Sequence, residues 1–374
     1  MSRHDEISSV IARHLQRCIA LATKGRRTVA AHPMVGCVIV KDGRIVGQGF
    51  HAAFGAAHAE IEALRKAGAS ARGADLYVNL EPCNHTGKTP PCTEAIIRAG
   101  IKRVIFGMND VNKNVKGGGA VRLRKAGIEV IGPALVSASK QLNEVYVKNC
   151  ETGLPFVTMK IAQSIDGFIA LADGSSSWIT NPLSRSYVQR LRVHVDAILI
   201  GAETLRMDNP KLLHGWKSAR EQYRIVLSRS LRLPKKTTLF TDEYRSRTIV
   251  LSSAASIRRN AKNISSLVKN SVEIVPVRAR KDGWIDPVEA LKYLFERGIY
   301  SLMIEGGSEV FSQFMEAGMV DKVELFIAPK LFGDGIPAFP LHPIMNLESA
   351  TEFRLDAQKV FGDDILLTYY PVKK

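Results

Sequence analysis

The chain has 374 residues, of which 45% are hydrophobic and 24% are charged. It is longer than one typical domain, and this balance excludes a disordered or low-complexity protein. No apolar run reaches the ~18 residues of a membrane-spanning helix, and the charged first thirty positions are unlike a secretory signal. We therefore expect two domains, a cytoplasmic location, no membrane partner, and reduced thiols.

The net charge of +16 is unevenly divided along the chain. Residues 1–148 hold 22 basic and 11 acidic groups, which gives +11, and the remaining 30 and 25 give +5. Such an excess suits a phosphorylated ligand or nucleic acid. The basic residues are dispersed and are not interleaved with aromatics, however, so a solvated basic surface is an equal alternative.

The first part of the chain alternates helix and strand signals. We expect a helix over 9–23, a hairpin around Asp42 and Gly43, and then strands at 76–80, 103–107 and 128–132 separated by helices that start near Ala59, Cys92 and Gly119. This alternation favours a three-layer α/β domain.

The polar stretch VKNCETGLP, residues 147–155, is the expected linker, which places the domains at 1–148 and 149–374. A second α/β pattern follows it. Its expected strands are 156–162, 197–201, 223–228, 248–252, 272–277, 301–307 and 323–329.

The loop LEPCNHTGKTPPC, residues 80–92, contains two of the five cysteines. Cys83 and Cys92 could form a disulfide, pack as thiols, or bind a metal together with a third ligand. His58 and Cys92 each stand where a helix is expected to begin, and the positive end of a helix stabilises a thiolate. Three His/Cys/Cys ligands leave a fourth position for water, as in a catalytic zinc site, and zinc lowers the pKa of that water.

Glu60, two residues after His58, can carry a proton from water to a leaving amine. The order H-x-E, P-C, P-C is typical of zinc-dependent nucleobase deaminases. We therefore predict Zn²⁺ bound by His58, Cys83 and Cys92, with Glu60 as the catalytic acid and base. The other cysteines, Cys18, Cys37 and Cys150, are expected to be packing residues.

With HPMVGCVIV before the loop and DVNKNVKGGG after it, the chain resembles the bifunctional riboflavin-biosynthesis deaminase/reductase family over nearly its whole length. The resemblance implies a cytidine-deaminase-like domain followed by a dihydrofolate-reductase-like domain. It implies deamination of a diaminopyrimidinone ribosylamino 5′-phosphate, then reduction of the ribosyl group to ribityl with NADPH. The expected partner is this phosphorylated pyrimidine, in a homo-oligomer that binds no nucleic acid.

Several first-half residues are expected to bind the substrate. Lys88 suits its phosphate and His85 its sugar or ring, and the alternative for Lys88 is a solvated loop lysine. The resemblance also places His51, Asp110 and Asn112 around the substrate.

Two positions depart from the family pattern in this half. His32 stands where the family has Asn, and imidazole cannot donate and accept in the planar manner of an amide. Asp110-Val111-Asn112-Lys113 stands where the family reads D-P-N-P.

In the second half, the stretches at 158–170, 197–212 and 303–310 resemble the reductase. The resemblance implies substrate contacts from Lys160, Asp208 and Glu305, each of which could instead form a structural ion pair. The expected cofactor-binding residues are Gly201, Ser228, Arg229, Gly306 and Gly307, with backbone N–H groups of the last two offered to a pyrophosphate.

This half also departs from the family pattern. Phe168 replaces a basic residue, Asn209 the second acid of D-D-P, and Ser228 an Asp. A diverged relative with one active half, or with a modified pyrimidine substrate, is therefore an alternative. A nucleic-acid-binding protein with a structural zinc site is another, and it would require a fourth protein ligand.

Overall fold

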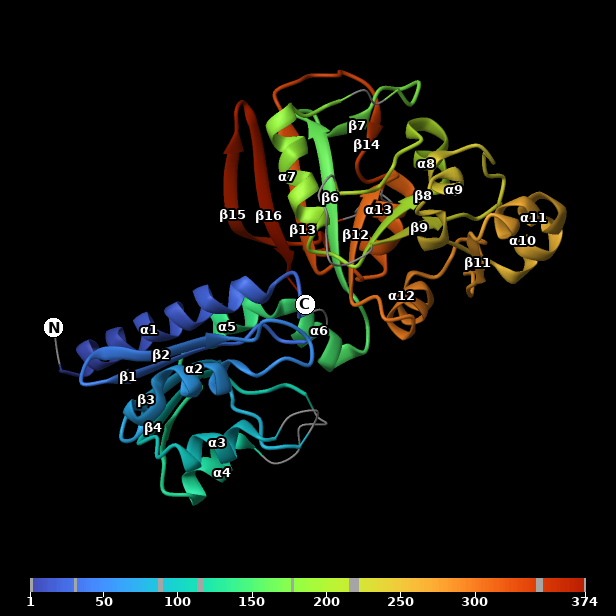
Figure 1. Ribbon diagram of the computed structural model, residues 1–374. Helices are drawn as coiled ribbons and strands as arrows, with labels where there is room; N and C mark the ends of the chain where they lie inside the picture. The colour runs from blue at the N-terminus through green and yellow to red at the C-terminus, as the bar shows by residue number, and fades with distance from the viewer. Residues whose placement is uncertain are drawn as a thin grey trace. The chain divides into compact units, whose positions relative to one another are not determined.

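The computed structural model describes residues 3–29, 32–86, 90–112, 118–175, 178–214, 222–340 and 346–372. The chain forms two compact units, Met1–Gly153 and Leu154–Lys374 (Figure 1). Both have the α/β character predicted from the sequence. Among the residues just given, no helix is long and apolar enough to cross a membrane.

The first unit is built on a five-stranded sheet. Its order is β2 (Arg44–Phe50), β1 (Gly36–Lys41), β3 (Asp75–Leu80), β4 (Arg103–Met108) and β5 (Glu129–Ile131). Strand β1 is antiparallel to β2 and β3, whereas β3, β4 and β5 are parallel. The predicted hairpin is present, and both Asp42 and Gly43 have the positive φ that a tight two-residue turn requires.

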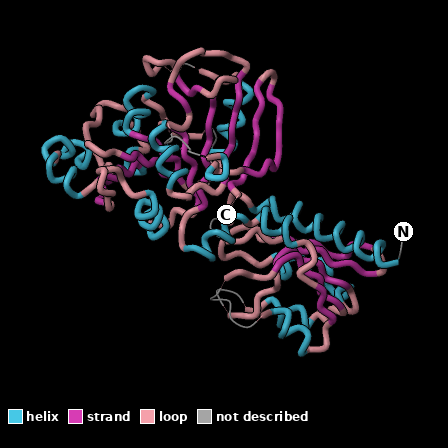
Figure 2. The backbone as a smooth tube through the Cα atoms, turned by 180° about the vertical axis from the view of Figure 1, so that it is seen from behind, coloured by secondary structure: helices cyan, strands magenta, loops and turns pink. Residues whose placement is uncertain are grey.

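Helices cover both faces of this sheet (Figures 1 and 2). They are α1 (Arg3–Ala22), α2 (Ala59–Ala67), α3 (Cys92–Arg98), α4 (Gly119–Lys125), α5 (Val136–Leu142) and α6 (Glu144–Thr152). Side chains alternate along β1, so Val38 and Val40 pack with Leu15 and Cys18 of α1. Cys37 and Ile39 point to the other face and pack in the core that also holds residues of α2, α3 and α4. The result is the predicted three-layer arrangement.

A nine-stranded sheet forms the second unit. Its order is β11 (Glu273–Pro276), β10 (Thr248–Ser252), β9 (Tyr223–Leu227), β8 (Ala197–Gly201), β12 (Ser301–Gly306), β6 (Phe156–Ser164), β13 (Lys322–Ala328), β16 (Asp364–Pro371) and β15 (Phe353–Phe361). The strands from β11 to β13 are parallel, and β16 and β15 are antiparallel additions at one edge. A short pair, β7 (Phe168–Ala170) and β14 (Ile336–Pro337), lies apart from this sheet.

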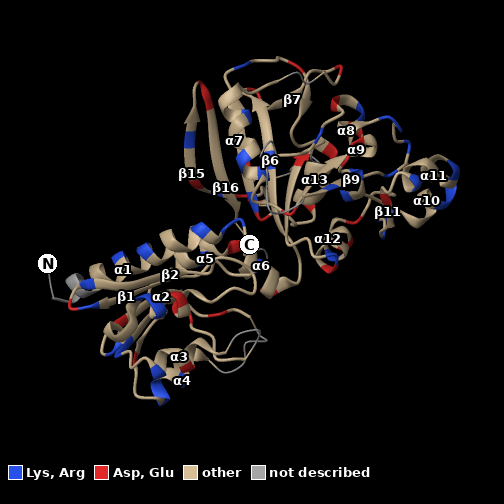
Figure 3. Cartoon of the chain, viewed as in Figure 1, with Lys and Arg blue, Asp and Glu red and all other residues tan. Residues whose placement is uncertain are grey.

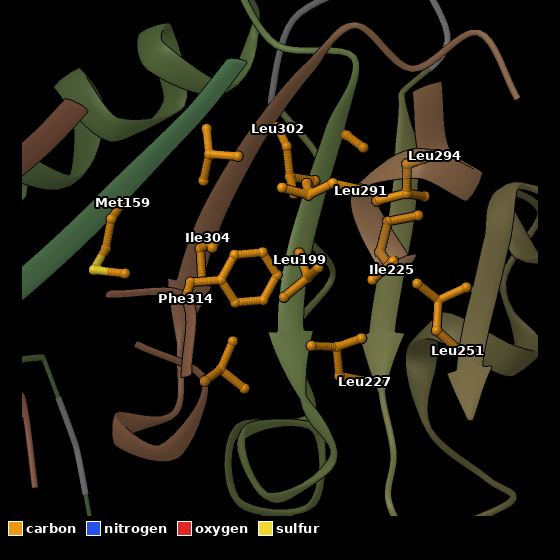
Figure 4. Packing of buried hydrophobic residues seen from close by; sticks show 14 of the residues in the cluster. Met159, Leu199, Ile225, Leu227, Leu251, Leu291, Leu294, Leu302, Ile304 and Phe314 are labelled. Atoms are coloured by element: carbon orange, nitrogen blue, oxygen red, sulfur yellow. The ribbon is translucent and has the colours of Figure 1, made fainter. Parts of the chain in front are cut away.

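The helices of this unit also cover both faces of its sheet. They are α7 (Pro182–Arg192), α8 (Ala202–Asp208), α9 (Thr238–Thr241), α10 (Ala254–Arg259), α11 (Ala261–Lys269), α12 (Pro287–Glu296) and α13 (Ser308–Glu316). On one face, Leu199 and Ile225 pack against Leu291, Leu294 and Phe314 of α12 and α13 (Figure 4). The alternate strand residues point to the opposite face, where they pack against α8, α9 and α11.

Candidate active sites

Three potential metal ligands of the first unit lie together. His58 is the N-cap of α2, Cys83 lies in the loop after β3, and Cys92 is the first residue of α3. The Nδ1 atom of His58 is 3.1 Å from Cys92 Sγ and 3.5 Å from Cys83 Sγ. All three donor atoms lie within 4.8 Å of one another, so they are close enough to share one ion. An imidazole and two thiols are ligands that zinc prefers.

The environment of Cys83 favours the thiolate, the form that binds metal, whereas the hydrogen bond with Cys83 and burial raise the pKa of Cys92. The hydrogen bond with the Cys92 thiol lowers the pKa of Cys83. Burial opposes this effect, but a further hydrogen bond with His58 adds to it, so the pKa of Cys83 lies below its ordinary value. The backbone N–H of Cys92 also points to Cys83 Sγ, at 3.4 Å. By contrast, burial raises the pKa of Cys18 and of Cys37, which lie in the core as free thiols, as expected of packing residues.

Glu60 lies in the first turn of α2 and is only 4% exposed. Burial, and then the charge of Cys83, raise the pKa of its carboxyl to about 7. A carboxyl group with this pKa can both accept and return a proton near neutral pH, which is the requirement for general acid and base catalysis.

The predicted substrate residues of this unit lie in different environments. His51 is buried, its Nδ1 is 3.2 Å from the carbonyl oxygen of Ala57, and its ring lies edge-on to His58 at 5.5 Å. His32 is exposed and stacks on Phe54 with the ring centroids 4.3 Å apart. His85 is exposed on the cysteine loop. Two other residues singled out in the sequence, Lys88 and Lys113, lie outside the described residues.

Asp110 and Asn112 follow β4, at the edge of the sheet where β3 leads into the loop of Cys83. Oδ1 of Asp110 accepts hydrogen bonds from the backbone N–H of Asn112 (2.9 Å) and from the hydroxyl of Tyr146 on α6 (2.7 Å). Burial raises the pKa of the Asp110 carboxyl. The role of Tyr146 was not foreseen, because no local pattern links α6 to the end of β4.

Two buried asparagines that the sequence analysis missed fix the segment after His32. The side chain of Asn79 accepts from Gly36 N (2.7 Å) and donates to Met34 O (2.9 Å). The side chain of Asn143 accepts from Met34 N (2.7 Å) and donates to the same carbonyl (3.1 Å). The signal for Asn79 was available, since it is a polar residue in an otherwise apolar strand.

The second unit contains a cavity of about 1840 Å³. It opens at the carboxyl ends of parallel strands, where ligands bind in open α/β sheets. All the substrate and cofactor residues predicted for this half line it: Lys160, Gly201, Asp208, Ser228, Arg229, Glu305, Gly306 and Gly307. The structure therefore brings together residues that are up to 147 positions apart, from Lys160 to Gly307.

A buried ion pair lies in this cavity. Arg192 Nε is 2.6 Å from Glu305 Oε1, and its Nη2 is 2.6 Å from Oε2. Burial alone would raise the pKa of Glu305, but the charges of Arg192 and then Lys160 outweigh it and hold the pKa below its ordinary value. Burial lowers the pKa of Lys160. Arg192 was missed because its pattern on α7 is that of an ordinary amphipathic helix.

The structure explains why each of the three predicted cofactor-binding positions is occupied by glycine. Gly307 is the N-cap of α13 and has a φ of +90°, which an L side chain rarely adopts. A Cβ on Gly201 would lie 3.0 Å from Val310, and one on Gly306 would lie 2.8 Å from Thr204. These two glycines therefore allow close packing of α13 and α8 around the cavity.

The departures noted in the second half have local structural roles. Asn209 ends α8 in the left-handed region, with a φ of +40°, which Asn tolerates well, and its Oδ1 accepts from Thr238 N (2.8 Å). Ser228 Oγ accepts from Leu231 N (3.1 Å). Phe168 begins β7, which pairs with β14.

Comparison with known families gives two matches. Residues 8–108 match the cytidine and deoxycytidylate deaminase zinc-binding region, and residues 155–367 match the RibD C-terminal domain. The chain is 37% identical over 358 residues to the riboflavin biosynthesis protein RibD of Actinobacillus pleuropneumoniae, covering 95% of this chain and 94% of that protein. It is 41% identical over 320 residues to RibD of Synechocystis, covering 86% and 84%.

The chain belongs to the RibD family. Solved RibD structures agree. Acinetobacter baumannii RibD has a TM-score of 0.83 at 33% identity, covering 98% of this chain and 100% of that one. A diaminohydroxyphosphoribosylaminopyrimidine deaminase/5-amino-6-(5-phosphoribosylamino)uracil reductase from Thermotoga maritima has the same TM-score at 35% identity, covering 98% and 99%. The predicted family, the α/β fold class of both halves and the bifunctional type of enzyme are confirmed.

Proposed function

We propose that this chain catalyses two consecutive steps of riboflavin biosynthesis. The first unit deaminates the diaminopyrimidinone ribosylamino 5′-phosphate by hydrolysis, and the second reduces the ribosyl group of the resulting uracil to ribityl with NADPH. The observation that carries the deaminase assignment is the three-ligand cluster of His58, Cys83 and Cys92 beside the buried carboxyl of Glu60.

In the deaminase, His58, Cys83 and Cys92 would hold zinc, which would supply an activated water for hydrolysis at the ring carbon that bears the leaving amine. Glu60, buried beside these ligands, would accept a proton from that water and return it to the departing ammonia. The edge-on contact of His51 with His58 supports a place for His51 beside the reacting ring.

The remaining deaminase residues bind the substrate around this centre. Asp110 and Asn112 contact the polar groups of the nucleotide, and His32 and His85 contact its ring or sugar. Lys88 binds the phosphate, since a lysine ammonium is a common phosphate ligand. The parallel pairing of β3 and β4 supports the assignment of Asp110, because Asp110 and the cysteine loop both follow strands that end at the same edge of the sheet.

In the reductase, the common cavity supports a shared role for the predicted residues. Lys160 and Glu305 contact the opened sugar of the substrate, and Asp208 binds the hydroxyl groups of the same sugar. The turn at Gly306 and Gly307 would offer backbone N–H groups to the pyrophosphate of NADPH. The remaining cofactor contacts are made by Gly201, Ser228 and Arg229.

Incubating the protein with the diaminopyrimidinone phosphate, with and without NADPH, tests both steps. We expect the ribosylamino uracil and ammonia without NADPH, and the ribityl product with it. Supplying the uracil intermediate directly separates the two activities. A protein that performs only one half-reaction would be the diverged relative suggested by His32 and Phe168.

A nucleic-acid-binding role is less well supported. Within the described ranges, the metal-ligand group contains three residues, whereas a structural zinc site normally has four. Figure 3 shows Lys and Arg spread over both units among Asp and Glu. We propose a cytoplasmic enzyme, because its metal-binding thiols need a reducing compartment.

We also propose a homo-oligomer that forms through β15. This strand lies at the edge of the nine-stranded sheet, and Leu355 and Val360 are 49% and 70% exposed there. Exposed apolar edge strands readily pair with another chain. Val360→Lys should therefore shift the protein toward monomer in sedimentation experiments, and an unchanged mass would contradict this interface.

A further inference from the structure

Arg229 and Trp284 form a stacked pair at one end of the reductase cavity. Arg229 follows β9, and Trp284 belongs to the loop between β11 and α12. The guanidinium carbon lies 5.2 Å from the centroid of the indole ring, within the range of a cation–π interaction. Both residues line the cavity.

The two segments that carry this pair are held in place independently of it. In the tryptophan loop, Ala279 forms an antiparallel bridge with Ile285, and Trp284 N donates to Asp282 Oδ1 (3.0 Å). Next to Arg229, the hydroxyl of Ser256 donates to the Arg229 carbonyl (2.7 Å). The backbone therefore presents the guanidinium and the ring to each other.

The charge of Arg229 is available to an anion. Its side chain is exposed, and Asp282 in the facing loop is paired with Arg280 at 2.8 Å. The residue before it is Ser228, a neutral side chain that is 1% exposed and hydrogen-bonded to Leu231 N. Asp282 of the facing loop interacts with the charges of both Arg280 and Arg229, but Ser228 places no carboxylate at the end of β9 itself. An arginine at this place suits the 2′-phosphate of an adenosine.

The position within the cavity indicates which end of the cofactor reaches this pair. Lys160 on β6 and Glu305 on β12 mark the reacting end. Strand β9 is separated from β6 by β8 and β12, so their ends are on the order of 14 Å apart. The Gly306–Gly307 turn lies between these ends. A dinucleotide with its nicotinamide at the reacting end therefore extends its adenosine end toward β9.

We infer that Arg229 and Trp284 form a clamp that selects NADPH over NADH, with Arg229 binding the 2′-phosphate and Trp284 fixing the guanidinium. This inference rests on the proposed reductase function and adds the residues that set its cofactor choice. It assigns a role to Trp284, which has no part in the proposed chemistry.

Calorimetric titration of the full-length protein with NADP⁺ and with NAD⁺ tests the clamp without any substrate. Arg229→Ala should weaken NADP⁺ binding about 10- to 100-fold, the effect of losing a charge-assisted contact, and leave NAD⁺ binding unchanged. Trp284→Leu should weaken NADP⁺ binding about 2- to 10-fold, and Trp284→Phe should restore most of it, because a phenyl face still attracts the cation.

Lys281→Ala is the matched control, since it removes an exposed cation of the same loop that does not line the cavity. It should leave both affinities unchanged. An equal loss of NADP⁺ and NAD⁺ binding in Arg229→Ala, or an equal effect of Lys281→Ala, would overturn the clamp. A raised KM for the phosphorylated substrate in Arg229→Ala, with unchanged NADP⁺ affinity, would also overturn the clamp. If the unaltered protein bound neither nucleotide, the reductase function itself would fail.

Discussion

The hydroxyl of Tyr146 donates a hydrogen bond to Oδ1 of Asp110 across 2.7 Å, and so joins α6 to the end of β4. The same oxygen accepts from the backbone of Asn112. Tyr146 is 8% exposed, so water does not easily replace its hydroxyl. These two hydrogen bonds thus hold the carboxyl group of Asp110 in one orientation.

Tyr146→Phe should raise the deaminase KM for the diaminopyrimidinone phosphate about 5-fold, since one hydrogen bond contributes about 1 kcal/mol. The kcat and the zinc content should not change. Tyr293→Phe is the control, because its hydroxyl donates to Glu273 in the second unit (2.6 Å). A fall in kcat with constant KM would assign Tyr146 a different role.

Cys83→Ser and Cys92→Ser should each lose bound zinc and deamination together, because a serine hydroxyl is a poor zinc ligand at neutral pH. Cys150→Ser should keep both, since this half-buried thiol lies outside the ligand cluster. Elemental analysis and ammonia release measure the two properties. Stoichiometric zinc in either ligand variant would exclude that cysteine from the site.

Glu60→Gln preserves side-chain volume but removes the group that exchanges a proton. Ammonia release should fall by about 10²–10⁴-fold, with zinc retained and with normal NADPH oxidation when the deaminated intermediate is supplied. Glu62→Gln, on the same helical turn, should be nearly neutral. Unchanged ammonia release in Glu60→Gln would mean that another group carries the proton.

Lys160→Ala should impair the reductase reaction and spare the deaminase reaction. It removes the only lysine of the Lys160, Arg192 and Glu305 group, so NADPH oxidation with the supplied intermediate should be lost while ammonia release persists. Lys322→Ala, at a neighbouring strand, offers a control for loss of a lysine. Loss of ammonia release in Lys160→Ala would argue against separate active sites.

The pKa of Glu305 predicts a pH-dependent stability. Because its pKa is lowered in the folded state, the stability that this carboxylate contributes is complete above its ordinary pKa of 4.5 and is lost as the pH falls through the folded value. At neutral pH, Glu305→Gln should destabilise the protein by about 3 kcal/mol, since it leaves Arg192 buried without its partner. The difference in Tm between the two proteins should narrow below pH 4.5, and a constant difference would contradict this linkage.

The sequence was most informative where a local pattern carries the chemistry. The H-x-E and P-C motifs predicted that His58, Cys83 and Cys92 lie together, because each of these residues begins or follows a regular element. Arg192, Tyr146 and Asn79 were missed for a different reason. Their partners lie 113, 36 and 43 positions away, and hydrogen bonds over such separations leave no local signature.

The same reasoning applies to the fold. The seven strands expected in the second half were all found, because most of them are continuous apolar runs, which are typical of parallel sheets. The hairpin of β15 and β16 was not predicted. Almost every residue of β15 is exposed, so it lacks the alternation that marks a half-buried strand.

A metal ion held by the proposed ligands would also stabilise the fold mechanically. His58 and Cys92 are 34 positions apart, and each begins a different helix. An ion held by both closes the intervening chain into a ring, as a disulfide does, and a covalent closure of this length removes on the order of 3–4 kcal/mol of chain entropy from the unfolded state. A bound metal would thus act as a cross-link of the fold, and a chelator that removes it would lower the stability of the first unit as well as its activity.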